Sequence, residues 1–202
     1  MIKAIVAKIK KASPSEEREL LSRLSEAARE RLLAKRDKGS YTASLFALSL
    51  LSSLACERGI SLDRLEYTGS GRPYLKGADA DISLSHSDGY AACAISDSAD
   101  SRVGIDVEDK ALDADRAKRI AKRFFTQKEL DQLARGADLL EIWTKKEALF
   151  KRLAEDSPPS LFLVDSASPE ESDSALLTEK KNEFTLSVCF SRDQKSEIII
   201  IQ

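Results

Sequence analysis

The order in which helical and extended periodicity occur along the chain constrains its fold more than any other feature. Residues 2–10 alternate like a first strand, and a capping box at Ser13–Glu16 then predicts a helix start. Leucines and alanines recur at helical spacing from there to Leu33, and a second, more apolar helix is expected from about Tyr41 to Arg58. Two alternating segments around an Asp-Gly turn predict a hairpin over residues 82–95. The first half of the chain therefore passes from helices to strands.

The second half repeats this order. An alternating strand is followed by expected helices and then by strand-like pieces: the strand at 103–108, helices at 115–124, from Thr126 onward and at 139–153, and extended segments at 161–164, 184–190 and 197–201. This order indicates two halves, residues 1–98 and 103–202, joined by a short polar segment. The similarity between the halves, residue by residue, is too faint to count as a sequence repeat.

Composition narrows the class of protein. The 202 residues include 32 basic and 34 acidic side chains, and this balance argues against a dedicated nucleic-acid binder. The three cysteines are far apart in apolar sequence, which fits buried free thiols in a reducing cytosol better than a disulfide framework or a zinc motif. The chain start lacks the pattern of a signal peptide, and we expect no apolar run long enough to span a membrane. We expect a cytoplasmic protein that binds neither membranes nor nucleic acids.

Two carboxylates stand two residues apart in the alternating strand over 103–108. Alternation places Asp106 and Glu108 on one face of that strand and its branched side chains on the other. Adjacent carboxylates repel unless a cation lies between them, and Mg²⁺ prefers oxygen ligands and often completes its shell with water and phosphate. Gly104, which is unusual inside a strand, would leave room beside Asp106. The pair indicates a phosphate-handling site; the alternative is two solvated acids on an edge strand.

A third carboxylate has an apolar setting. On the expected helix, Glu147 has Trp143 one turn before it and Phe150 one turn after it. It could be an exposed acid paired with Lys151, but a partly buried carboxylate is costly unless it is paired, and metal ligation would satisfy it. Lys151, one turn further on, would then be placed to neutralise phosphate oxygens.

Two further segments offer anion-binding groups. His86 is the only histidine, and Ser85 and Ser87 flank it at a strand end, so the imidazole and hydroxyl donors could bind an anion. A packed histidine is the alternative. Arg72 follows a glycine-rich turn that lets the backbone approach a ligand closely, and it could contact phosphate or be an exposed loop arginine.

The segment over 116–125 is cationic with apolar residues between the charges. Such a helix face is often simply solvated. Its functional alternative is docking of an acidic partner, with charge steering the encounter through Arg116, Lys118, Arg119, Ile120, Arg123 and Phe124.

Five motifs occur in a fixed order: Gly71-Arg72-Pro73, Ser85-His86-Ser87, Val103 to Glu108, Phe124-Phe125-Thr126 with Glu129, and Trp143 to Lys151. In this order and at this spacing they resemble those of the 4'-phosphopantetheinyl transferases, and specifically the long monomeric type that activates surfactin and related peptide or polyketide synthetases. The resemblance covers residues 69 to 151 well and the flanking regions loosely. Glu129 itself is interpreted as a helix-capping residue.

The resemblance implies an α+β fold of two similar halves related by a pseudo-twofold, each a small antiparallel sheet packed with helices. It implies that coenzyme A binds in the cleft between them. It also implies Mg²⁺-dependent transfer of the 4'-phosphopantetheine group to a serine of an apo acyl or peptidyl carrier protein, with release of 3',5'-ADP. The enzyme would be a monomer, and its carrier partner would be acidic.

Roles for individual residues follow from the resemblance. The metal ligands would be Asp106, Glu108 and Glu147, and the catalytic residues Glu147, Asp106 and Lys151. Glu147 or a water on the metal would take the serine proton. The residues expected to bind coenzyme A are Arg72, Pro73, Ser85, His86, Lys146 and Lys151.

The chain also departs from the family pattern. The arginine that usually begins the second helix and holds the 3'-phosphate is missing from Ser40–Ser44, and Lys35, Arg36 and Lys38 remain as substitutes. The glycines that commonly follow the final lysine are missing too. Alternative functions are another Mg²⁺-dependent phosphoryl-transfer enzyme, such as a nuclease, and a non-catalytic homologue that binds coenzyme A or the carrier. The pathway, the carrier and the choice between Mg²⁺ and Mn²⁺ stay open.

Overall fold

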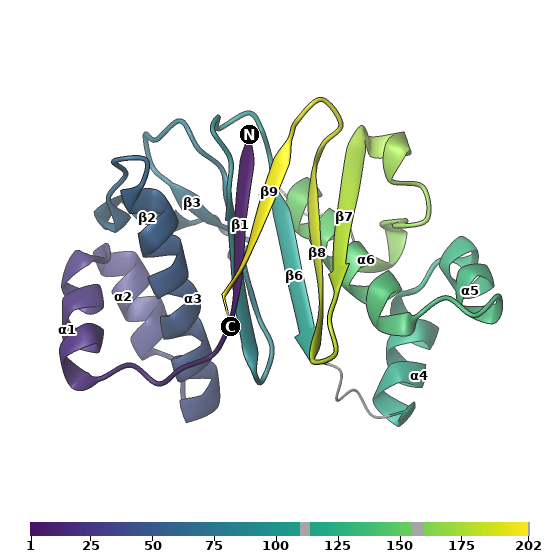
Figure 1. The fold of residues 1–202 in the computed structure, drawn as a ribbon, viewed down its shortest axis with the longest axis horizontal. Helices are drawn as coiled ribbons and strands as arrows, with labels where there is room; N and C mark the ends of the chain where they lie inside the picture. The colour runs from purple at the N-terminus through teal and green to yellow at the C-terminus, as the bar shows by residue number, and fades with distance from the viewer. Residues whose placement is uncertain (110–113, 155–159, 202) are drawn as a thin grey trace.

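The computed structural model describes residues 1–109, 114–154 and 160–201. Within them, helices pack on three small sheets with strand orders β4-β5-β1-β9, β2-β3 and β6-β8-β7 (Figure 1). Among these described residues, all strand pairs are antiparallel except β1 with β9. This arrangement confirms the expected α+β fold class.

The first half supplies the elements on the left of Figure 1. They are β1 (Ile2–Lys8), α1 (Pro14–Arg23), α2 (Glu26–Leu33), α3 (Lys38–Cys56), η1 (Leu62–Arg64), β2 (Leu65–Tyr67), β3 (Pro73–Leu75), β4 (Ile82–His86) and β5 (Tyr90–Ile95). The second half supplies β6 (Gly104–Asp109), α4 (Ala114–Phe124), α5 (Gln127–Ala134), α6 (Leu139–Leu153), η2 (Leu161–Leu163), η3 (Pro169–Ser172), β7 (Ser174–Lys180), β8 (Phe184–Ser191) and β9 (Ser196–Ile201).

Both halves share one topology, although their sequences barely resemble each other. In each, a first strand is followed by three α-helices and, after the inserted pair β2-β3 in the first half, by a hairpin, β4-β5 or β7-β8. The second strand of each hairpin pairs antiparallel with the first strand of its half, giving β4-β5-β1 and β7-β8-β6. The longest helix of each half, α3 or α6, packs on its own sheet.

The last strand crosses between the halves. β9 lies within the segment predicted as the C-terminal half, but it pairs parallel with β1 from Ile2↔Ser196 to Ala7↔Ile201. The N-terminal sheet is therefore completed by the end of the chain, and a division at residues 98–103 assigns this strand to the wrong sheet. A strand so rich in isoleucine finds apolar partners on both sides of that sheet, since Ile199 packs with the helical core and Ile198 with the core between the sheets.

The core has a layer on each side of the N-terminal sheet. One face of that sheet carries the cluster formed with α1, α2 and α3, and the other carries the cluster shared with β6 and β8. Val103, Ile105 and Val107 are buried in this second cluster. The alternation of β6 therefore turns Asp106 and Glu108 the other way, toward α6.

Several local expectations need correction. The helix expected to run to Leu33 is two helices, because Ser25 caps α2 and its amide bonds the carbonyl of Leu62, 3.1 Å away. The piece at 161–164 forms the 3-10 turn η2 instead of a strand, and β7 was not expected.

Cys56 is exposed, whereas Cys93 and Cys189 are buried. Helix α3 is long and apolar enough to cross a membrane by composition, yet half of that stretch is buried inside the protein.

The two halves are joined along β4 and β6 by side chains instead of a backbone ladder. Asp81, Ser83 and Ser85 accept hydrogen bonds from the amides of Val103, Ile105 and Val107, at 2.8, 3.1 and 3.4 Å respectively. Because both segments are extended, partners two residues apart stay in register. This joint fixes Ser85 and the strand that carries Asp106.

Candidate functional site

A cavity of about 400 Å³ lies between the halves, beside the joint of β4 and β6. The N-terminal half lines it with α2, α3, β4 and the loop around residue 71, and the C-terminal half with β6 and α6. Its lining brings together seven of the nine residues expected to form the site: Pro73, Ser85, His86, Asp106, Glu108, Glu147 and Lys151.

Asp106 is the most buried of the three carboxylates. Its Oδ1 accepts hydrogen bonds from Lys151 Nζ and Ser85 Oγ, each at 2.7 Å. Its Oδ2 is buried and has no hydrogen-bond partner among the described residues. A buried carboxylate oxygen without a donor is costly, so this oxygen is suited to a cation at the cavity wall.

Glu108 lies two residues further along the same face. Its Oε1 accepts a hydrogen bond from Trp143 Nε1 at 3.1 Å, which links β6 to α6. Burial, and then the neighbouring charge of Asp106, raise the pKa of Glu108 to about 7. Burial likewise raises the pKa of Glu147, and Asp106 adds to that rise. The negative charge of Asp106 therefore opposes ionisation of both glutamates in the same cavity.

This donor set fits a hard divalent cation in its chemistry. Bound Mg²⁺ would give the unpaired buried oxygen of Asp106 a partner. Its positive charge would also stabilise the ionised forms of Glu108 and Glu147, whose pKa values are raised. Within the described residues, however, no three acidic, histidine or cysteine side chains form a preassembled metal cluster. Lys151 and Trp143 hold one oxygen each of Asp106 and Glu108.

Gly104 has a different role from the one predicted. A Cβ at this position would lie 1.9 Å from the main-chain oxygen of Ala148 and 2.7 Å from the nitrogen of Arg152. The missing side chain thus makes room for α6, not for a phosphate or a cation. It lets the helix approach β6 closely enough for Glu147 and Lys151 to face Asp106.

Lys151 reaches back over β6 from the last turns of α6. Its ammonium donates to Asp106 Oδ1, to the carbonyl of Ile105 at 3.1 Å and to Ser85 Oγ at 3.2 Å. Three acceptors hold this charge at the cavity wall, where it can meet an anionic ligand.

His86 lies at the mouth of the cavity, where Ser44 Oγ is 3.1 Å from its Nε2. Desolvation of the ring lowers the pKa of His86, and the nearby charges of Lys35 and Lys151 lower it further. The lowered pKa favours a neutral imidazole at His86, so the positive charges nearby are those of Lys35, on the N-terminal side of the cavity, and of Lys151, beside Asp106.

Sequence reasoning missed several lining residues, above all Arg31. Its guanidinium stacks over the ring of Tyr67, 4.5 Å from the centroid. Gly71 has φ +88°, and a Cβ there would come within 2.9 Å of Arg31 Nη2, so this glycine leaves space for the guanidinium. Lys35 also lines the cavity, unlike the other two proposed substitutes for the missing arginine. The signal available in the sequence was the pair Arg31 and Lys35, four residues apart at the end of a helix.

Two residues predicted to bind coenzyme A face elsewhere. Arg72 is buried and ion-paired with Asp81 at 2.5 Å, so its guanidinium is held between the halves. Lys146 is fully buried; it pairs with Glu129 at 2.9 Å and also donates to the carbonyl of Val164. Successive residues of a helix point about 100° apart, so Lys146 is turned away from the cavity side that carries Glu147 and lies instead against Glu129.

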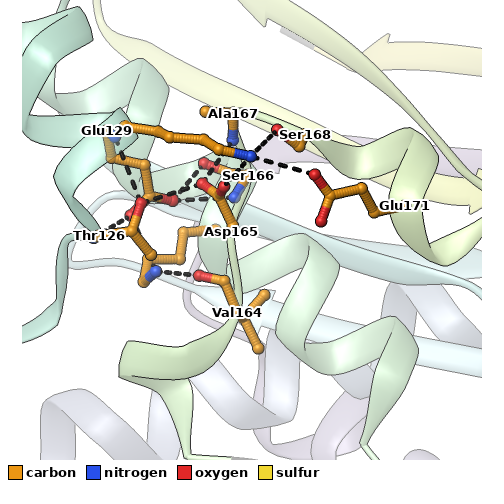
Figure 2. A network of polar contacts seen from close by, with 10 residues as sticks. Thr126, Glu129, Val164, Asp165, Ser166, Ala167, Ser168 and Glu171 are labelled. Atoms are coloured by element: carbon orange, nitrogen blue, oxygen red, sulfur yellow. Dashed lines mark hydrogen bonds and ion pairs between the residues drawn. The ribbon is translucent and has the colours of Figure 1, made fainter.

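Figure 2 shows the polar network that surrounds this buried pair. Thr126 and Glu129 form the predicted capping box of α5, which is confirmed. Glu129 Oε1 also accepts from the amide and hydroxyl of Ser166, at 2.9 and 2.7 Å. Glu129 is thus both a cap and a buried acceptor that anchors the segment after η2 against α5 and α6.

Four of the five cations of the predicted docking helix line one hollow. A shallow hollow on α4 is lined by Arg116, Arg119, Ile120, Lys122, Arg123 and Phe124. Lys118 is exposed but does not line it. The Phe124 ring packs against Trp143 with centroids 5.5 Å apart, so the hollow contacts the helix that carries Glu147.

Comparison with known families gives one match. Residues 102–198 match the family model of the 4'-phosphopantetheinyl transferase superfamily, a span slightly shorter than half of the 202-residue chain. It contains Asp106, Glu108, Glu147 and Lys151. No curated protein matched the chain. The family match supports a phosphopantetheinyl-transferase role in general terms.

Proposed function

We propose that this chain, whose C-terminal half matches the 4'-phosphopantetheinyl transferase superfamily, transfers the 4'-phosphopantetheine group of coenzyme A to a serine of an apo carrier protein. One observation carries the proposal: a single cavity between the halves has carboxylates on one wall and cations on another. A ligand that carries both a metal-binding pyrophosphate and further phosphate charge would satisfy both walls.

The cations and the aromatic wall suit the nucleotide end of coenzyme A. Arg31, Lys35 and His86 lie on the N-terminal side of the cavity, and Lys151 lies on the C-terminal side. Arginine held by stacking is preorganised to bind phosphate through two donors. We assign Arg31 and Lys35 to the role of the missing 3'-phosphate arginine, with Tyr67 beside the base or ribose.

Asp106, Glu108 and Glu147 would hold Mg²⁺. When bound, the ion would neutralise pyrophosphate charge and help to orient the group that is transferred. The unpaired Oδ2 of Asp106 and the raised pKa values of the two glutamates support this role.

In the transfer itself, the carrier serine oxygen attacks the β-phosphorus of coenzyme A. A new phosphorus–oxygen bond forms to serine, and the bond to the bridging oxygen breaks, so that 3',5'-ADP leaves with the bonding electron pair. Glu147 is the proposed acceptor of the serine proton, because its raised pKa brings it closer to neutral pH. Lys151 stabilises charge on the phosphoryl oxygens.

The carrier is proposed to dock on α4. Carrier proteins of this class are acidic, and the hollow on α4 combines four cationic side chains with the apolar Ile120 and Phe124. Charge would speed the encounter, and the partly exposed Phe124 would supply apolar contact area. The packing of Phe124 on Trp143 places this surface next to the helix that carries the proposed base.

The test is the mass of an apo carrier protein after incubation with coenzyme A and Mg²⁺. We expect the carrier to gain the mass of one phosphopantetheinyl group. Glu147→Gln and Asp106→Asn should slow the gain by about 10²-fold or more, as expected for loss of groups that stabilise transition-state charge. Asp63→Asn, an exposed acid outside the cavity, is the matched control and should leave the rate unchanged.

Two results would contradict the proposal. One is full activity of both cavity variants, which would remove these carboxylates from the chemistry. The other is hydrolysis of plain DNA or RNA with Mg²⁺ while every apo carrier in a panel of acyl and peptidyl carriers stays unmodified, which would favour a nuclease.

A further inference from the structure

We infer that Arg72 and Asp81 form a positioning pair that sets the spacing between the two halves and so places the walls of the cavity. We call this pair the cross-half clamp. The catalytic consequence of the clamp rests on the proposed function. Its structural basis is independent of that function, because it consists of contacts between the halves.

Arg72 belongs to the N-terminal half, but most of its guanidinium contacts lie in the C-terminal half. Its Nη1 donates to the carbonyl of Lys151, near the end of α6. Its Nη2 donates to the carbonyl of Val103 at 3.2 Å, just before β6. One side chain thus ties together the two elements that carry the carboxylates and the lysine of the site.

The carbonyl of Lys151 is among the last four of its helix, which have no regular partner within the helix. Arg72 therefore caps the end of α6 as well as bridging to it. A change in the position of this carbonyl moves the backbone of the residue whose ammonium contacts Asp106 at 2.7 Å.

Asp81 completes the clamp from the segment before β4. Its Oδ2 accepts from Arg72 Nη2 at 2.5 Å and from the amide of Val103 at 2.8 Å. The Asp81 amide in turn contacts Ser96 Oγ at 2.8 Å. The carboxylate thus holds the guanidinium and the start of β6 at once.

Burial shows that the clamp is not a ligand contact. The side chains of Arg72 and Asp81 are only 8% and 11% exposed, and neither lines the cavity. The planar fork of arginine reaches several acceptors in fixed directions, and lysine cannot reproduce this geometry with a single ammonium. Retaining the positive charge at position 72 should therefore not rescue the function of the clamp.

The experiment compares Arg72→Lys, Arg72→Gln, Asp81→Asn and the double variant Arg72→Gln/Asp81→Asn by their kcat and KM for coenzyme A. We expect each single variant to lower kcat by about tenfold or more, because small displacements of reacting groups are costly, while KM changes by less than about threefold. The double variant should resemble the worse single variant, as expected for residues that act as a unit. Arg18→Gln, an exposed arginine on α1, is the matched control.

A second readout does not depend on activity. Trp143 is the only tryptophan, and its indole bridges α6 to Glu108, so its emission reports the contact between α6 and β6. In the folded clamp variants we expect the emission to change, whereas Arg18→Gln should leave it unchanged. Far-UV circular dichroism verifies folding, and Asp81→Asn and Arg72→Lys remain as tests if Arg72→Gln does not fold.

Three results would overturn the inference. The first is a rise in KM at unchanged kcat for Arg72→Gln that Arg72→Lys rescues, which would make Arg72 a phosphate contact. The second is an Asp81→Asn variant with unchanged kinetics. The third is unchanged Trp143 emission in every clamp variant. If the unsubstituted protein transfers nothing, the proposed function fails, and the emission measurements then decide the clamp alone.

Discussion

The buried ion pair between Lys146 and Glu129 is expected to respond differently to the loss of each partner. Lys146→Met leaves a carboxylate that still accepts from the amide of Thr126 at 2.8 Å and from two donors of Ser166. Glu129→Gln leaves a fully buried ammonium with the carbonyl of Val164 and at best one amide oxygen. Hydrogen bonds to a charged group partly replace its lost partner, so the carboxylate is the better protected of the two ions.

The magnitude follows from this difference in remaining partners. Breaking a buried pair costs about 3–5 kcal/mol, since the remaining charge stays buried without compensation. We expect the free energy of unfolding to fall by about 3 kcal/mol for Lys146→Met and by about 5 kcal/mol for Glu129→Gln. For a chain of 202 residues these values correspond to falls in Tm of about 7 °C and about 12 °C.

The adjacent residue supplies a matched control. Lys145 pairs with Glu141 at 2.6 Å on the helix surface, where both side chains are about 30% exposed. Lys145→Met should cost only about 0.2–1 kcal/mol, because exposed pairs contribute little. Urea unfolding followed by circular dichroism measures all three variants. Equal losses for Lys145→Met and Lys146→Met, or a smaller loss for Glu129→Gln than for Lys146→Met, would refute the reasoning.

Three further predictions concern the cavity and its walls. In EDTA, the free energy of unfolding should fall as pH rises from about 5 to about 7. In this range Glu108, with its pKa of about 7, still binds a proton in the folded chain, whereas the unfolded chain has released it. Glu108→Gln should flatten this pH dependence, as measured by urea titrations. Gly104→Ala should cost more than about 3 kcal/mol, since its Cβ would overlap a main-chain carbonyl of α6, whereas Gly69→Ala, with open space around it, should cost less than about 1 kcal/mol by the same measurement. Arg31→Gln should raise KM for coenzyme A about tenfold, with a smaller effect for dephospho-coenzyme A, while Lys38→Gln, outside the cavity, should change neither value in steady-state kinetics.

Local patterns were sufficient to predict most elements of the fold. The hairpin of β4 and β5, the capping boxes at Ser13 and Thr126, and α6 from Leu139 to Leu153 lie where periodicity and capping chemistry placed them. These features depend on neighbours within about four residues, so the sequence carries their signal directly. The break at Ser25 was missed because a contact with the distant residue Leu62 helps to set it.

The candidate site was predictable to a similar degree. Strand alternation correctly placed Asp106 and Glu108 on one face, and the helical period correctly predicted that Glu147 and Lys151 share a side of α6. Residue type alone did not distinguish Lys146 from Lys151, since both are lysines expected to bind coenzyme A. The burial of Lys146 against Glu129 shows that it faces away from the cavity. Whether these groups bind a metal and coenzyme A stays a prediction.

By itself, then, the sequence determined the period of each element and which side chains share a face. The tertiary structure alone decided what each face meets: α6 pressed against Gly104, Arg72 held between the halves, and β9 returned to the first sheet. The physical reason is that periodicity is a property of consecutive residues, whereas burial and ion pairing depend on groups brought together from distant parts of the chain.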